Sequence, residues 1–145
     1  LVVASDDIEE MVRFYTENVG FVISDRVVDD ENHLRACFMR SDDEHHCLAV
    51  FKAASKRLDH HCYEAGDWNS IRDWADHLSS NEIPIIWGPG RHGPGNNLFL
   101  FFKDPDGNWL EISAELETLD DGRPVGEWEH AERTLNLWGK GMLRS

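Results

Sequence analysis

The sequence has few basic residues, because only 14 lysines and arginines stand against 28 aspartates and glutamates, for a formal net charge of −14. A nucleic-acid partner is not expected, since a phosphate backbone is bound mainly through Lys and Arg. The same charge disfavours an anionic membrane surface. No apolar run approaches the ~20 residues of a membrane span, and no basic segment followed by an apolar one opens the sequence. We therefore expect neither a nucleic-acid nor a membrane partner.

Cysteine is also scarce. Cys37, Cys47 and Cys62 are odd in number and widely spaced, so the sequence suggests neither a disulfide framework nor a paired-cysteine metal knuckle. This usage is typical of a reducing compartment, and we expect a cytoplasmic protein.

The residues that are present suffice for one ordinary domain. The sequence holds 145 residues, of which 41% are hydrophobic, and six tryptophans, enough to fill a core without a second domain. Apolar periodicity predicts a strand, a helix that starts at Ser5 or Asp6 and three further strands. These elements are expected at 2–4, 5–17, 21–28, 34–40 and 46–51.

The same order of elements returns in the second half of the sequence. A strand, a helix opened by Asp67 and three strands are expected at 58–65, 67–78, 83–87, 98–102 and 109–113. Superposing Asp6 on Asp67 aligns the halves as an internal repeat of roughly 60 residues, which suits a pseudo-symmetric pair of βαβββ modules.

Three motifs carry chemistry. They are the pair His60-His61, the loop Gly90-Arg91-His92-Gly93, and the turn Asp104-Pro105-Asp106-Gly107 that leads to Glu111. Together they contain the elements of a two-histidine, one-carboxylate metal site. Strand alternation lets His61 and Glu111 each point into a cleft. The same residues could also be an ordinary strand histidine and a solvent-facing acid.

With the segment Glu44-His45-His46-Cys47, these motifs resemble the vicinal oxygen chelate superfamily, which includes glyoxalases, bleomycin resistance proteins and dioxygenases. The chain is most similar to the catalytic domain of type I extradiol ring-cleaving dioxygenases. The resemblance covers residues 1–117 and implies an α+β fold, in which modules 1–55 and 56–117 form an open, cleft-containing mixed β-barrel with flanking helices. Residues 118–145 are expected to be an extension packed on this domain, either as simple packing or as a cover for the cleft or a subunit contact.

The resemblance also implies a metal site. His61 and Glu111 match two metal ligands of the family, and the third ligand, a histidine, is expected just before Leu1. The metal is expected to be Fe(II), with Mn(II) as an alternative. The implied reaction is extradiol cleavage of a catechol-type aromatic diol by O2, and we also expect a homo-oligomer.

Further roles follow from the same resemblance. His46 matches an acid/base histidine, His92 a histidine that orients the substrate, and Phe101 and Trp109 are expected to contact the substrate. The family usually has Tyr at the position of Phe101, so one hydrogen-bond donor is missing, and catalysis is expected to be slower without loss of metal binding. His45 and His60 are expected at the surface.

Two other functions remain open at this point. One is a metal-dependent lyase or isomerase of the glyoxalase kind, which chelates vicinal oxygens without consuming O2. The other is a small-molecule-binding protein without catalysis, for which the missing donor at Phe101 argues slightly.

Overall fold

A single mixed sheet organises the part of the chain that the computed structural model describes, residues 1–143. Its strand order is β6-β7-β8-β5-β1-β4-β3-β2-β9. The first half comprises β1 (Val2–Ser5), α1 (Ile8–Phe14), the π-helix η1 (Tyr15–Val19), β2 (Val22–Val28), β3 (Leu34–Arg40) and β4 (Leu48–Lys52). The second half comprises β5 (Arg57–Glu64), α2 (Trp68–Ser80), β6 (Trp87–Arg91), β7 (Leu98–Lys103) and β8 (Trp109–Ala114). The tail adds β9 (Gly126–Glu129) and α3 (Glu132–Leu135).

The two helices of the repeat begin in the same way. The carboxylate of Asp7 accepts a hydrogen bond from the backbone N–H of Glu10, and that of Asp67 accepts one from the N–H of Ser70, each at 3.0 Å. An aspartate at this position satisfies one of the unpaired donors of a helix N-terminus. The predicted cap at Asp67 is confirmed, whereas the start at Ser5 or Asp6 is wrong because Asp7 makes the capping bond.

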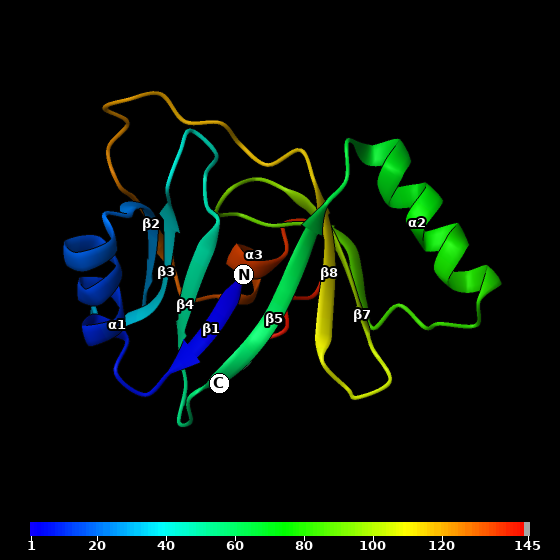
Figure 1. Ribbon diagram of the computed structural model, residues 1–145, viewed down its shortest axis with the longest axis horizontal. Helices are drawn as coiled ribbons and strands as arrows, with labels where there is room; N and C mark the ends of the chain where they lie inside the picture. The colour runs from blue at the N-terminus through cyan, green and yellow to red at the C-terminus, as the bar shows by residue number, and fades with distance from the viewer. Residues whose placement is uncertain (144–145) are drawn as a thin grey trace.

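The modules join at the centre of the sheet. β1 pairs in parallel with β4 and antiparallel with β5, and β5 pairs in parallel with β8. Figure 1 shows β1 and β5 side by side in the middle of the molecule, with α1 and α2 at opposite ends. The sheet curls around an interior, as expected for the vicinal oxygen chelate fold, and the predicted α+β architecture is confirmed.

Two predictions about local structure are wrong. Residues 83–86 form no strand, and β6 begins only at Trp87. His46 precedes β4 instead of opening it. In α2 the buried residues are Ile71 and Leu78, whereas Trp74 is 39% exposed.

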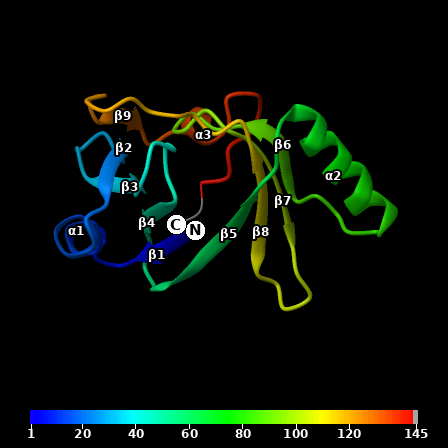
Figure 2. The same cartoon turned by 45° about the horizontal axis from the view of Figure 1, so that its top comes forward.

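The tail runs along both halves. β9 pairs in parallel with β2, so that Gly126 lies opposite Asp25. After α3 the chain passes between the two halves of the curled sheet toward the N-terminus (Figure 2). A division at residue 117 stays a prediction, since β9 extends the same sheet. Among the described residues, no helix is both long and apolar enough to cross a membrane.

Candidate functional site

The curl of the sheet encloses a cavity of about 330 Å³. This volume is within the range of small-molecule sites. Its wall combines both modules and the tail, which contributes Leu135, Met142 and Leu143. The polar lining includes His46, His60, Cys62, His92, Asn97, Glu111 and Ser113. One wall thus gathers the chemistry-bearing side chains that are far apart in the sequence.

Glu111, on β8, is the centre of this polar group and is 5% exposed. The Nε2 atom of His60, on β5, lies 3.2 Å from its Oε2, and the Nε2 atom of His92 lies 3.4 Å from its Oε1. Asn97 holds the neighbouring Ser113 through a 2.8 Å hydrogen bond and approaches Glu111 Oε1 at 3.5 Å. The carboxylate therefore meets two imidazoles inside the cavity.

The other nitrogen of each imidazole is already used. His60 Nδ1 lies 2.7 Å from the carboxylate of Asp59, and His92 Nδ1 lies 2.6 Å from the backbone carbonyl of Leu135. Carboxylate and carbonyl oxygens only accept, so each Nδ1 carries a proton. In the neutral rings, both Nε2 lone pairs then face the oxygens of Glu111. Such a convergence of acceptors is favourable only when a proton or a metal cation lies among them.

The donor set fits a divalent metal. Burial raises the pKa of Glu111, but His60 and His92, when they carry a proton on Nε2, outweigh this effect and hold the pKa below its ordinary value. A buried, ionised carboxylate beside an imidazole whose other nitrogen is bound to an aspartate is a typical metal-ligand arrangement. No cluster of three or more His, Cys, Asp or Glu side chains within residues 1–143 is arranged to hold a metal. His60 and Glu111 are thus two candidate ligands of an incomplete set.

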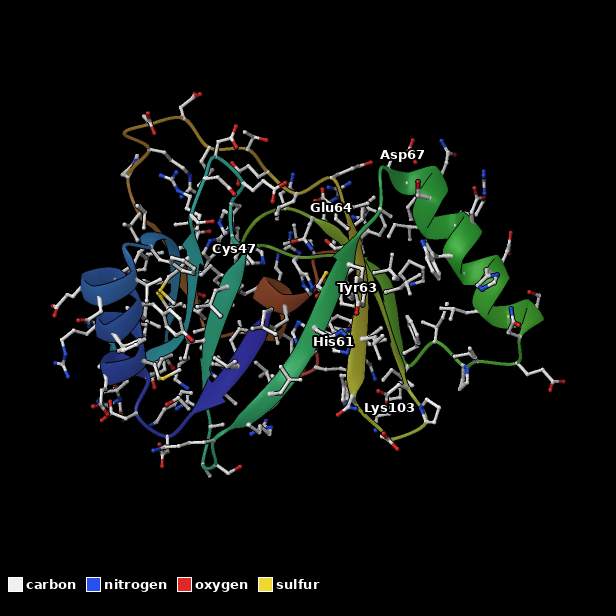
Figure 3. All side chains as sticks on the ribbon, viewed as in Figure 1. Cys47, His61, Tyr63, Glu64, Asp67 and Lys103 are labelled. Atoms are coloured by element: carbon white, nitrogen blue, oxygen red, sulfur yellow. The ribbon has the colours of Figure 1, made fainter. Side chains whose placement is uncertain are left out.

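His61, the histidine assigned to the metal from the sequence, is not brought to Glu111. It does not line the cavity, and its ring centroid lies 5.4 Å from that of Tyr63. Figure 3 labels both residues along β5. Successive side chains of a strand alternate between faces, so only one histidine of the pair can face the cavity. The prediction was one residue out of register, and His60, expected at the surface, is 4% exposed.

The helix caps align the two halves of the chain in a different register. Superposing Asp7 on Asp67, which make the same capping bond, aligns the halves one residue differently from Asp6 on Asp67. In that alignment the counterpart of His60 falls immediately before Leu1.

His46 lines the cavity, as its predicted role requires. Burial, followed by the neighbouring His45, lowers its pKa from 6.5 to about 3. The imidazole is therefore neutral near pH 7, with one ring nitrogen free of a proton. His45, in contrast to the prediction of a surface position, is fully buried.

His92 is fixed in orientation. Its ring stacks on Phe99 with centroids 3.9 Å apart and an interplanar angle of 10°. Its backbone N–H donates to the carbonyl of Asn97 at 2.9 Å. The side chain enters the cavity from the end of β6 as part of an ordered wall.

The two predicted substrate contacts differ. Phe101 lines the cavity, 1% exposed, with its ring edge-on to His60 at 5.0 Å. Trp109 does not line the cavity, and its ring packs against Phe101 at 5.9 Å. Although Trp109 lies two residues from Glu111, it sits behind Phe101. The prediction that it contacts the substrate is not supported.

Known proteins resemble this chain over nearly all of its length. It is 29% identical over 134 residues to metapyrocatechase 2 of Cupriavidus necator. These residues make up 91% of the chain and 41% of that protein. The Mn(II)-bound glyoxalase from Novosphingobium aromaticivorans superposes with a TM-score of 0.86 at 33% identity, covering 97% of the chain and 45% of that structure. An extradiol ring-cleaving dioxygenase from B. fuscum superposes with a TM-score of 0.87 at 27% identity. The superposition covers 96% of the chain and 40% of that structure.

The chain thus spans less than half the length of these relatives. The family model of the Glyoxalase/Bleomycin resistance protein/Dioxygenase superfamily matches residues 1–112. This match covers the first module and the second as far as Ile112, and the fold agrees with it. The chain belongs to the Glyoxalase/Bleomycin resistance protein/Dioxygenase superfamily.

Proposed function

We propose that this chain provides the catalytic site of an extradiol ring-cleaving dioxygenase that acts on a catechol-type aromatic diol with O2. The observation that carries the proposal is the convergence of His60 and His92 on the buried carboxylate of Glu111, with His46 on the same cavity. Relatives named metapyrocatechase and extradiol ring-cleaving dioxygenase support the same chemistry.

The metal is proposed to be Fe(II), held by His60 and Glu111. The third ligand expected immediately before Leu1 stays a prediction and is the counterpart of His60 in the repeat. A bound Fe(II) would supply open positions at which a diol and O2 react. Asp59 would orient His60 by holding its Nδ1 proton, which leaves Nε2 as the ligand atom. Mn(II) is the alternative, since one related structure holds it.

The side chains around the site divide the remaining work. His46, neutral near pH 7, would accept a proton from a diol hydroxyl and return it later in the reaction. His92, held by Phe99 and by the Leu135 carbonyl, would orient the substrate through Nε2. Phe101 and Trp87 present stacked rings 5.1 Å apart, which would exclude water and suit an aromatic ring.

A second function rests on one observation. The Mn(II)-bound glyoxalase from Novosphingobium aromaticivorans is 33% identical to the chain. A metal-dependent lyase or isomerase is therefore the alternative activity. A homo-oligomeric state and a cytoplasmic location stay predictions.

The test is anaerobic reconstitution of the natural full-length protein with Fe(II), followed by oxygen-electrode assays with several catechols and detection of the yellow ring-opened product. We expect one O2 consumed per diol opened. Stoichiometric iron without O2 uptake on any catechol would overturn the dioxygenase and favour the lyase or isomerase. The absence of metal binding would instead favour a binding protein without catalysis.

A further inference from the structure

A chain of buried polar groups lies behind His46. Asp25, on β2, and His45 are both fully buried. His45 Nε2 lies 3.0 Å from Asp25 Oδ2, and His45 Nδ1 lies 2.8 Å from His46 Nδ1. A carboxylate and two imidazoles are thus connected in series from the sheet interior to the cavity wall.

The chemistry of these groups fixes where the protons lie. The carboxylate of Asp25 only accepts, so His45 Nε2 carries a proton. The Nδ1 atom of neutral His45 is then an acceptor, and the short contact requires the Nδ1 atom of His46 to donate. The lone pair of His46 is consequently on Nε2, which is the nitrogen left to act as a base.

The tail of the chain binds Asp25, the member of this series farthest from the cavity. Arg123 Nη1 donates to Asp25 Oδ1 at 2.8 Å, and the indole N–H of Trp128 donates to Oδ2 at 2.7 Å. Gly126, opposite Asp25 on β9, has no side chain, and a Cβ there would collide with Asp25 Oδ1. The carboxylate therefore accepts two hydrogen bonds from the tail and lies 3.0 Å from His45 Nε2.

The loop that follows His92 covers the histidine pair. A Cβ on Gly95 would lie 3.1 Å from His45 Nδ1 and 3.2 Å from His46 Cε1, and the residue has a φ of +78°. A side chain at this position would therefore crowd both rings.

We infer that Asp25 and His45 are positioning residues that set the tautomer of His46 and share the charge that His46 gains when it takes a proton. When His46 Nε2 accepts a proton from a hydroxyl, its Nδ1 proton moves toward His45 Nδ1. The positive charge then spreads to His45 beside the ionised Asp25, while the hydroxyl oxygen keeps the electron pair. The tail, through Arg123 and Trp128, supports a residue of the active site. The catalytic part of this inference rests on the proposed function, whereas the tautomer does not.

Two substitutions of His45 separate its contact with Asp25 from its contact with His46. In His45→Gln the side-chain amide can still donate to Asp25, but no acceptor remains beside His46 Nδ1. In His45→Asn the amide oxygen can accept from His46, but the link to Asp25 is cut. Nitrogen NMR of the histidine rings in the full-length protein reports which nitrogen of His46 is protonated. We expect an Nδ1–H tautomer in the native protein and in His45→Asn, and its loss in His45→Gln.

Steady-state kinetics with Fe(II) and a catechol test the catalytic part. We expect kcat to fall by at least about 10-fold in both variants, with little change in KM and in bound iron. An Nε2–H tautomer of His46 in the native protein, or an unchanged tautomer in His45→Gln, would overturn the inference. An unchanged kcat in both variants would overturn the inference that His45 and Asp25 share the charge that His46 gains. If the native protein opens no catechol, the proposed function fails while the NMR result still decides the tautomer.

Discussion

Each module contributes an aspartate and a pair of adjacent histidines, yet the two sets are built differently. In the second module Asp59 contacts His60 directly, and His61 turns away from the cavity. In the first module both histidines turn inward, and His45 lies between Asp25 and the cavity-lining His46.

The backbone explains this difference. His60 and His61 belong to β5, where alternation sends neighbours to opposite faces. His45 and His46 lie in the irregular segment before β4, and the backbone N–H of His45 donates to Glu117 at 2.8 Å. Without strand geometry, two adjacent side chains can share one side. The pair His60-His61 therefore provides one candidate metal ligand. The pair His45-His46 provides a candidate base and a residue that positions it.

Removing one histidine of the β5 pair is expected to have the largest effect. His60→Asn should abolish stoichiometric Fe(II) binding, because it removes a ligand atom. The affinity should fall by more than ~100-fold, which is more than the loss caused by removing a residue that only orients a ligand. His61→Asn is the matched control and should bind iron normally. Metal content after dialysis measures both. Normal binding in His60→Asn with loss in His61→Asn would restore the original assignment.

The two aspartates should differ in what they support. Asp59→Asn is expected to weaken metal binding by about 10- to 100-fold, since it frees the ring orientation of a ligand histidine. Asp25→Asn should leave metal affinity within about 2-fold, because His46 is not a ligand. Competition titrations with a metal chelator measure both values. Equal losses in the two variants would contradict the division between a ligand site and a base.

The Asp25 site should also depend on pH. Burial raises the pKa of Asp25, but hydrogen bonds from His45, Arg123 and Trp128 lower it from 3.8 to about 2. A depressed pKa contributes stability that is complete above about pH 4 and is lost as the pH falls through 2. Its magnitude is about 2 kcal/mol. Urea unfolding of the native protein and Asp25→Asn should therefore differ near pH 7 and converge toward pH 2. A difference independent of pH would contradict an ionised Asp25.

The smallest effect is expected at Phe101. Phe101→Tyr restores a phenol beside His60 and should raise kcat by up to about 10-fold, provided the hydroxyl meets the substrate. Its burial should lower the free energy of unfolding by about 1 kcal/mol. Trp109→Phe, outside the cavity wall, should leave kcat and KM unchanged. A larger loss in Trp109→Phe than the change in Phe101→Tyr would return Trp109 to the substrate site.

Much of the fold could be predicted because it depends on local patterns. The repeated order of strands and helices and the cap at Asp67 follow from periodicity and from residue types that suit those positions. The roles of Glu111 and His46 were predicted from the family resemblance of their motifs, and both side chains line the cavity. The choice between His60 and His61 failed, since a shift of one residue exchanges the faces of a strand and both registers fit the pattern equally well.

The sequence alone determined the class of the molecule: two βαβββ modules, an acidic chain, and a supply of histidines and one carboxylate suited to a metal. Only the tertiary structure decided which imidazoles reach Glu111 and that Asp25, His45 and His46 are connected. These contacts join β2, β9 and the segment before β4, and contacts between distant segments depend on the register and curl of the sheet. Local residue preferences specify neither, because register and curl result from packing the whole sheet around its interior.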